Sequence, residues 1–310
     1  MSQIMQKKPD NLTGYLLVLA ATIIWSFNFI VARGLVESVP PVTLAFLRWS
    51  VALVIMVPFA AKSSWKARRI IWNNVGYLSV CAAMGVTSFN TLVYMAAHTS
   101  PAVNMSLIAT STPLFVILFN RFFVGEPITM GRLLGLVSAT LGVIVLVTKG
   151  DPAILLTLTF TEGDLWMLLA AVLFAVYTIL VRRMPDNLPQ GAFLTAIIVL
   201  GLVFLLPWLV REHMGSVSVA WSSTAIIAIL YIGVGPSVAA FLCWNRAVEV
   251  IGPARASFVY FSLPAFSGLE AALILHEGIG WVHLVSGVLI LFGIITATRA
   301  STRYPAVKNP

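Results

Sequence analysis

The second half of this chain repeats the first. At a shift of 149 residues, Gly14 falls on Gly163; at a shift of 151, Ala96 falls on Ala247 and Pro113 on Pro264. Each half holds five apolar segments, and because five is odd the two copies must cross a membrane with opposite polarity. Inverted repeats of this kind are typical of secondary transporters, whose substrate site lies near the midplane between the copies.

The composition requires a membrane protein. The chain is 59% hydrophobic and 10% charged, with a mean hydropathy of +0.97, whereas soluble domains carry about 25% charged residues. A spanning helix needs about 20 mostly apolar residues. We expect an all-α integral membrane protein with ten transmembrane helices in two inverted five-helix repeats, at residues 14–32, 42–61, 73–96, 101–123, 131–148, 163–181, 190–209, 221–245, 254–275 and 282–298.

These spans divide the chain into three parts. The first five-helix repeat covers residues 1–148, a periplasmic linker covers residues 149–162, and the second repeat with a cytoplasmic tail covers residues 163–310. The connections are too short to hold a soluble domain such as an attached ATPase. The linker is expected to be exposed and to let the two halves move relative to each other.

The basic residues predict the orientation. With the N-terminus inside, only Arg33, Lys149 and Arg211 fall outside, and Arg48 lies within a span. Fifteen others fall inside: Lys7, Lys8, Lys62, Lys66, Arg68, Arg69, Arg121, Arg132, Arg182, Arg183, Arg246, Arg255, Arg299, Arg303 and Lys308. This is a strong positive-inside bias. The net charge of +8 is therefore a topology signal and not a nucleic-acid surface, and we expect a protein of the cytoplasmic (inner) membrane with both termini cytoplasmic.

Polar groups inside a span are costly unless they face protein or a water-filled cavity, so they indicate where a solute could bind. Asn90 and Tyr94 lie four residues apart and share one helix face. Two interpretations remain open: they grip one solute together, or they tie the third span to a neighbouring helix. With them, the candidate substrate-binding set consists of Trp25, Asn28, Asn90, Tyr94, Asn104, Ser111, Tyr177, Trp244 and Tyr260.

Two charged side chains lie within spans. Arg48 is about one turn into the second span, and we place it among the structural residues, held against carbonyls or reaching to an interface. Glu270 precedes Glu277 by seven residues, which puts it about 10 Å deeper at 1.5 Å per residue. A lone intramembrane carboxyl is a candidate for proton coupling; the alternatives are that it reaches outward or pairs with His276 or His283.

Two repeat-related pairs are expected to be structural. Pro113 and Pro264 fall within the fourth and ninth spans, and each frees a carbonyl and bends its helix. Such bends suit a central cavity or a gate, or they only improve packing. Glu126 and Glu277 stand at the ends of the same spans, on opposite membrane faces, and are expected to anchor nearby helix ends rather than take part in coupling.

Signatures of catalysis are missing from the sequence. It contains no G-x-S-x-G, no H-E-x-x-H and no P-loop, so we predict a protein that is not an enzyme. His276 and His283 make no convincing metal site. The two cysteines, Cys81 and Cys243, lie inside spans without disulfide or metal-ligand spacing. We expect no metal and no cofactor.

Several short motifs lie along the chain: Pro113-Leu-Phe followed by Gly125-Glu126-Pro127, Gly135 and Gly142; Pro264-Ala-Phe with Glu277, Gly287 and Gly293; Trp25 with Asn28; and Leu47-Arg48-Trp49. Together they resemble the motifs of the drug/metabolite transporter superfamily, in particular its EamA-type exporters. His276 departs from the glycine that precedes the glutamate in the first copy. The resemblance covers essentially the whole chain and implies a ten-helix carrier with a central cavity, often exporting amino acids, their derivatives or amphipathic toxins.

The sequence thus predicts a secondary active transporter that exports a small organic metabolite, an amino acid or related compound, by alternating access. Arg48 alone could not neutralise a phosphate, whereas the rings and amides suit a neutral, zwitterionic or aromatic solute. One alternative is a broad-specificity exporter of lipophilic cations, with Glu270 as its carboxylate. The other is a membrane receptor or scaffold that transports nothing. Expected partners are the metabolite, protons and membrane lipid, with the chain a monomer or a dimer.

Overall fold

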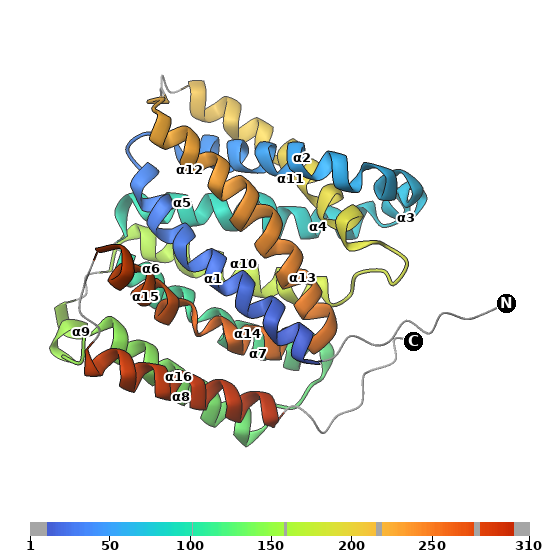
Figure 1. The fold of residues 1–310 in the computed structure, drawn as a ribbon. Helices are drawn as coiled ribbons and strands as arrows, with labels where there is room; N and C mark the ends of the chain where they lie inside the picture. The colour runs from blue at the N-terminus through green and yellow to red at the C-terminus, as the bar shows by residue number, and fades with distance from the viewer. Residues whose placement is uncertain (1–10, 101, 158–159, 215–218, 276–279, 301–310) are drawn as a thin grey trace.

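A computed structural model describes residues 11–100, 102–157, 160–214, 219–275 and 280–300. Within these ranges every regular element is helical, as expected (Figure 1). The first repeat holds α1 (Asn11–Leu35), α2 (Pro41–Lys66), α3 (Arg68–Asn73), α4 (Val75–Cys81), η1 (Ala82–Ser88), α5 (Phe89–Thr99), α6 (Ala102–Ala109), α7 (Thr112–Phe119), η2 (Asn120–Val124) and α8 (Met130–Val147). After α9 (Ala153–Thr157), the second repeat holds α10 (Glu162–Val181), α11 (Gln190–Met214), α12 (Ser223–Val234), η3 (Gly235–Ala239), α13 (Ala240–Ile251), α14 (Pro253–Tyr260), α15 (Leu263–Leu275) and α16 (Trp281–Arg299).

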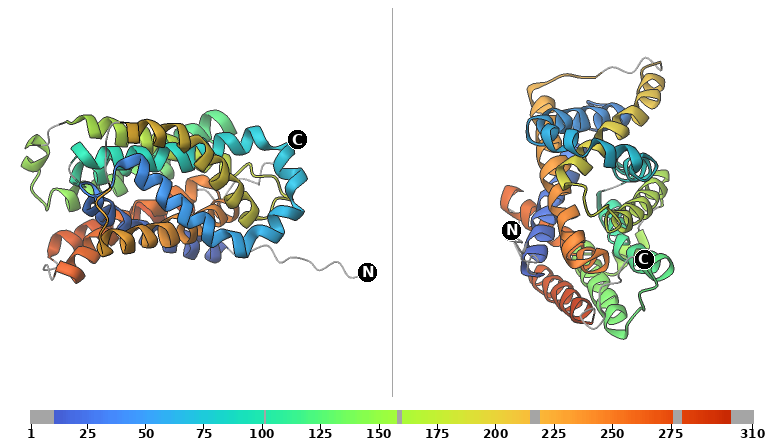
Figure 2. Two further views of the ribbon diagram at one scale, coloured as in Figure 1. Left: turned by 90° about the horizontal axis from the view of Figure 1, so that it is seen from above. Right: turned by 90° about the vertical axis from the view of Figure 1, so that its right-hand side faces the viewer.

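The first helix of each repeat packs against a helix of the other repeat. α1 packs against α13 of the second repeat, and α10, its counterpart, packs against α5 of the first. Two further large contacts join equivalent helices directly, α2 with α11 and α8 with α16. The last pair forms the lower edge of the bundle in Figure 1 and stays side by side in the right-hand view of Figure 2. The core therefore lies between the two copies.

Eight of the ten expected spans are confirmed as helical segments long and apolar enough to cross a membrane. The fourth and ninth are each divided into two helices by a two-residue turn, at Thr110-Ser111 and at Phe261-Ser262. Pro113 and Pro264 follow these turns as the second residue of α7 and of α15. A bend within one helix was expected at each proline, but a new helix begins there. Proline fits the first turn of a helix because its missing N–H is not needed at that position.

The third and eighth spans each contain a π-helical segment, η1 in one and η3 in the other. The 151-residue shift places the first segment over the second. π-Helical turns leave backbone carbonyls without regular partners and occur often at functional sites. The structure pairs two of these carbonyls with tryptophans of other helices: Trp49 Nε1 donates to Val86 O and Trp25 Nε1 to Pro236 O, both at 3.0 Å.

The two ends of the bundle differ in charge. We call the end where α2, α10, α13 and α16 finish the basic end; it lies at the right of Figure 1. It carries, among others, Lys62, Lys66, Arg68, Arg69, Arg182, Arg183, Arg246 and Arg299. The opposite end, which contains α9, is the linker end. The basic stretch at residues 62–69, between the second and third expected spans, is largely helical, formed by the last turn of α2 and the start of α3.

Candidate functional site

A cluster of aromatic rings occupies the centre of the interface between the repeats. The ring of Trp25 lies 5.4 Å from that of Phe174, 5.6 Å from Phe241, 5.3 Å from Trp244 and 6.2 Å from Tyr260, measured between centroids. All five residues are buried. Trp25 and Phe174 hold equivalent positions in the two repeats, so this pair marks the axis that relates them.

A small cavity lies beside this cluster. Its volume is about 20 Å³, and its walls come from α1, α5 and α14 as Trp25, Asn28, Phe89, Asn90, Val93 and Tyr260. Such a space holds about one water molecule. Among the described residues, no hydrogen-bond partner is present for the buried Oδ1 of Asn28. In this conformation the helices must separate before a metabolite can enter.

Behind the cavity wall lies Arg48, which is 0% exposed. Its Nη1 donates to Asn90 Oδ1 at 2.7 Å and to Tyr94 OH at 2.5 Å, and its Nε donates to Ser237 Oγ at 2.7 Å. The guanidinium also lies 5.3 Å from the ring centroid of Trp49 and 5.8 Å from that of Tyr94. Asn90 and Tyr94 thus bind a neighbouring helix, and Asn90 lines the cavity as well.

A tyrosine–asparagine pair joins α10 to α13 on the basic side of the aromatic cluster. Tyr177 OH donates to Asn245 Oδ1 at 2.9 Å, and both side chains are buried. The equivalent positions in the first repeat are Asn28 on α1 and Tyr94 on α5, with asparagine and tyrosine exchanged. Among the described residues, Asn28 and Tyr94 form no hydrogen bond with each other; the OH of Tyr94 accepts from Arg48 Nη1 instead. The Tyr177–Asn245 pair is therefore hydrogen-bonded in this structure, whereas the Asn28–Tyr94 pair is not.

The other predicted site residues lie apart from the cavity. Asn104 donates to Asp164 Oδ2 at 3.1 Å and joins α6 to the first turn of α10. Ser111 donates to the carbonyl of Ile108 at 2.6 Å, within the turn that divides the fourth span. Asn104 lies on α6 and Ser111 in the turn between α6 and α7, so both belong to the divided fourth span.

The predicted carboxylates have separate surroundings. Glu270 Oε1 accepts from Ser26 Oγ at 2.7 Å, and its buried Oε2 has no partner in the part of the chain that the structure describes. Glu126 pairs with Arg132 in the first turn of α8 at 2.8 Å, which is a contact to a nearby helix end. Glu277 and His276 lie outside the described residues. Within those residues, no group of three potential metal ligands occurs.

Sequence reasoning did not select Phe89, Val93, Phe174 and Asn245. Two of them could have been found from the internal repeat, because Phe174 is the counterpart of Trp25 and Asn245 that of Tyr94. Phe89 and Val93 carry no such signal; they line the cavity only because they share a helix face with Asn90 once α5 is packed.

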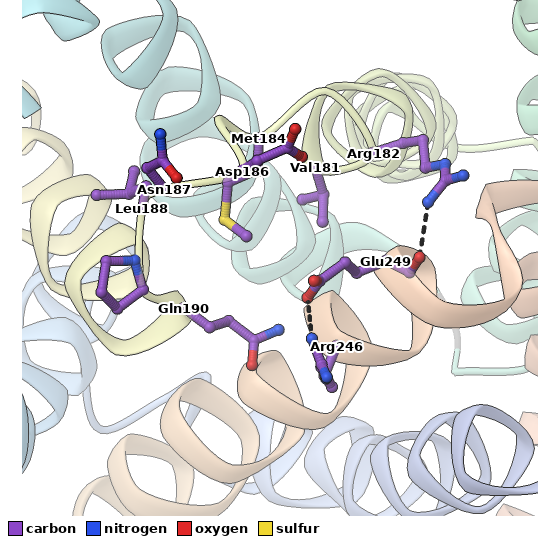
Figure 3. A pocket seen from close by; sticks show the side chains of 10 residues that line it. Val181, Arg182, Met184, Asp186, Asn187, Leu188, Gln190, Arg246 and Glu249 are labelled. Carbon is purple, nitrogen blue, oxygen red and sulfur yellow. Dashed lines mark hydrogen bonds and ion pairs between the residues drawn. The ribbon is translucent and has the colours of Figure 1, made fainter. Parts of the chain in front are cut away.

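A larger pocket opens at the basic end (Figure 3). Its volume is about 380 Å³, and it is lined by Val181, Arg182, Met184, Asp186, Asn187, Leu188, Pro189, Gln190, Arg246 and Glu249. Arg246 and Glu249 form an ion pair at 2.7 Å, and Arg182 Nη1 donates to the carbonyl of Glu249 at 2.6 Å. Val181 is one turn from Tyr177, so the pocket ends close to the Tyr177–Asn245 bond.

Comparison with known proteins gives consistent matches over the whole architecture. A model of the EamA-like transporter family matches residues 12–148 and again residues 161–299. The uncharacterized transporter YyaM of Bacillus subtilis (strain 168) is 26% identical over 93% of this chain and 94% of its own. A probable terminal-alkyne amino-acid exporter of Streptantibioticus cattleyicolor is 25% identical over 89% of this chain and 90% of its own.

Two further matches are of the same kind. A probable amino-acid metabolite efflux pump of Escherichia coli (strain K12) is 23% identical, over 90% of this chain and 92% of its own. A solved crystal structure matches the fold with a TM-score of 0.73 at 19% sequence identity, covering 94% of this chain and 98% of the other. That last likeness concerns the fold alone.

Proposed function

This chain belongs to the EamA-like transporter family, and on that premise we propose that it exports a small organic metabolite, an amino acid or related compound, by alternating access. The observation that carries the proposal is the cavity between the repeats, lined by rings and amides. Two relatives are named as an amino-acid exporter and an amino-acid metabolite efflux pump, which supports this substrate class. The lysines and arginines gathered at the basic end support a cytoplasmic location for that end, with the protein in the inner membrane.

The site has the chemistry that a zwitterionic or aromatic solute requires. Ring faces of Trp25 and Tyr260 supply apolar and cation-binding surface, while Asn28 and Asn90 supply hydrogen-bond groups. A substrate site between two opposed copies can be exposed to either side when one copy rocks against the other. This arrangement favours a carrier over a receptor or scaffold, which gains nothing from an inverted repeat.

Counterflow in proteoliposomes tests the function. Radiolabelled amino acids, dipeptides and cationic dyes would be offered to purified protein, and we expect uptake of at least one amino acid and of no dye. A Glu270→Gln variant should still exchange that amino acid, because Glu270 does not line the cavity, but should lose accumulation driven by a proton gradient. Uptake of dyes that depends on Glu270 would favour the lipophilic-cation alternative. A protein that moves none of these solutes would contradict the proposal.

Alternating access also needs a barrier that opens, and the Tyr177–Asn245 bond is our candidate at the basic end. The bond lies between the pocket at that end and the aromatic cluster, and it is formed while its counterpart at Asn28 and Tyr94 is not. We propose that the two pairs form alternately, so that breaking one accompanies making the other.

The native Cys81 can report opening of this barrier. It is fully buried in α4, one turn closer to the basic end than Gly85, against which the Tyr177 ring packs. In a Cys243→Ala background, Tyr177→Phe removes one hydrogen bond, which shifts an equilibrium roughly 2–13-fold. We expect the maleimide labelling rate of Cys81 to rise by that factor. Equal labelling in Tyr177→Phe and in the control Tyr15→Phe would contradict a gating role.

A further inference from the structure

Arg48 carries a positive charge that the protein does not balance. The side chain is completely buried, seven residues after the first residue of α2, which is about 10 Å along the helix. Its three hydrogen-bond partners, Ser237, Asn90 and Tyr94, are all neutral. In the part of the chain that the structure describes, Arg48 pairs with no carboxylate: the ion pairs found there are Arg132–Glu126 and Arg246–Glu249, both at the basic end.

The guanidinium also has unused donors. A guanidinium offers five N–H groups in a planar fork, and the two on Nη2 of Arg48 have no partner among the described residues. The rings of Trp49 and Tyr94 offset part of the charge through their faces. An unpaired charge in a low-dielectric interior is nevertheless costly, and inside membranes such groups mark substrate or ion pathways.

We propose that Arg48 is the carboxylate-binding group of the transport site, an inference that rests on the proposed export function and assigns its substrate class. Asn90 links Arg48 to the cavity, because its side chain accepts a hydrogen bond from Arg48 and also lines the cavity. When the helices separate, a carboxylate entering beside Asn90 reaches the fork of Arg48 and supplies the missing negative charge. A carboxylate that accepts from Nη2 and takes the place of Asn90 at Nη1 forms the strong bidentate pairing that arginine favours.

The remaining groups define the rest of the solute. Asn28 Oδ1, a buried acceptor without a partner in the described part of the chain, fits an N–H donor such as an ammonium group. Trp25 and Tyr260 add aromatic rings to the wall of the cavity. The solute is therefore a monocarboxylate with a nearby amino group, since one guanidinium balances one negative charge. Sequence reasoning placed Arg48 among structural residues because its neighbours in space could not be read from the chain.

The test compares acids with their primary amides, which differ from them by little more than the charge. The ligands are the proteinogenic amino acids and short aliphatic and aromatic monocarboxylates, each with its amide, measured by thermal stabilisation in detergent and by counterflow. Losing a charge-assisted hydrogen bond weakens binding roughly 10–150-fold. Wild type should therefore prefer the acid by that factor. Arg48→Gln should bring the preference close to one, and Arg48→Lys should keep part of it.

The control is Arg68→Gln, because Arg68 also lies over a tryptophan, with its guanidinium 4.9 Å from the ring centroid of Trp65, but at the surface. It should keep the acid preference of wild type. An unchanged preference for the acid in Arg48→Gln would overturn the inference. If the glutamine variant does not fold, equal binding of acid and amide by wild type would overturn it as well. Binding of simple monocarboxylates but of no amino acid would refute the proposed amino-acid export and leave the carboxylate site standing. Binding of neither class would overturn both.

Discussion

The substitution Gly135→Leu is expected to abolish stable pairing of α8 with α16 and to lower the free energy of unfolding by about 3 kcal/mol or more. A Cβ at Gly135 would lie 2.6 Å from the carbonyl oxygen of Gly293 and 2.6 Å from Cβ of Ala297. The carbonyl belongs to the backbone of α16, so it cannot move aside without separating the two helices. Thermal melting in detergent, followed by the monodisperse fraction on size-exclusion chromatography, measures the effect.

This close approach has a physical basis. In a membrane the hydrophobic effect does not drive helices together, so their association depends on packing between small residues. Gly131, Gly135, Ala139 and Gly142 supply such a surface on α8. Gly287→Leu is the matched control, because a Cβ at that position of α16 meets no heavy atom within 4 Å. Similar melting curves for the two variants would show that the glycine contact does not hold the repeats together.

Trp25→Ala is expected to cost about 3–5 kcal/mol of stability, the usual range for deleting a buried aromatic side chain, and to abolish transport. The substitution removes ring contacts with four aromatic residues and the hydrogen bond to Pro236 O in η3. Trp25→Phe keeps a ring in the cluster but loses that hydrogen bond, worth about 0.5–1.5 kcal/mol, together with part of the buried ring volume. We expect it to fold and to show reduced counterflow.

Trp72→Ala is the control for both tryptophan variants, since Trp72 is 77% exposed on α3. It should leave melting temperature and counterflow close to wild type. If Trp25→Phe transported at the wild-type rate, the indole bond to the π-helical segment would have no part in transport, and Trp25 would be a packing residue alone.

The order of the helices could be predicted from the sequence, because hydropathy and the internal repeat depend only on the order of residues along the chain. Eight expected spans are confirmed, and the match of one family model to both halves confirms that the chain is a repeat of one unit. Pro113 and Pro264 indicated where the fourth and ninth spans depart from a regular helix. They did not show that these spans divide, because a proline is equally compatible with a bend and with the start of a new helix.

The candidate site depended on contacts between segments far apart in the chain. Tyr177 was among the predicted substrate-binding residues, but its bond to Asn245 depends on how α10 and α13 cross. Asn104, which stays a predicted substrate-binding residue, contacts Asp164 in the first turn of another helix, and that contact could not be read from the chain. A helical periodicity shows which residues share a face, and only the packed bundle shows what that face meets.

The sequence by itself thus determined a helical membrane bundle built from two repeats, because apolar length and the repeat register are fixed along the chain. The tertiary structure decided the chemistry between the repeats. Arg48 on α2 meets Asn90 and Tyr94 on α5 and Ser237 in η3, and no local pattern relates these positions. Burial turns that guanidinium from an ordinary basic residue into an unbalanced charge, because its energy depends on the surrounding dielectric and partners and not on its place in the sequence.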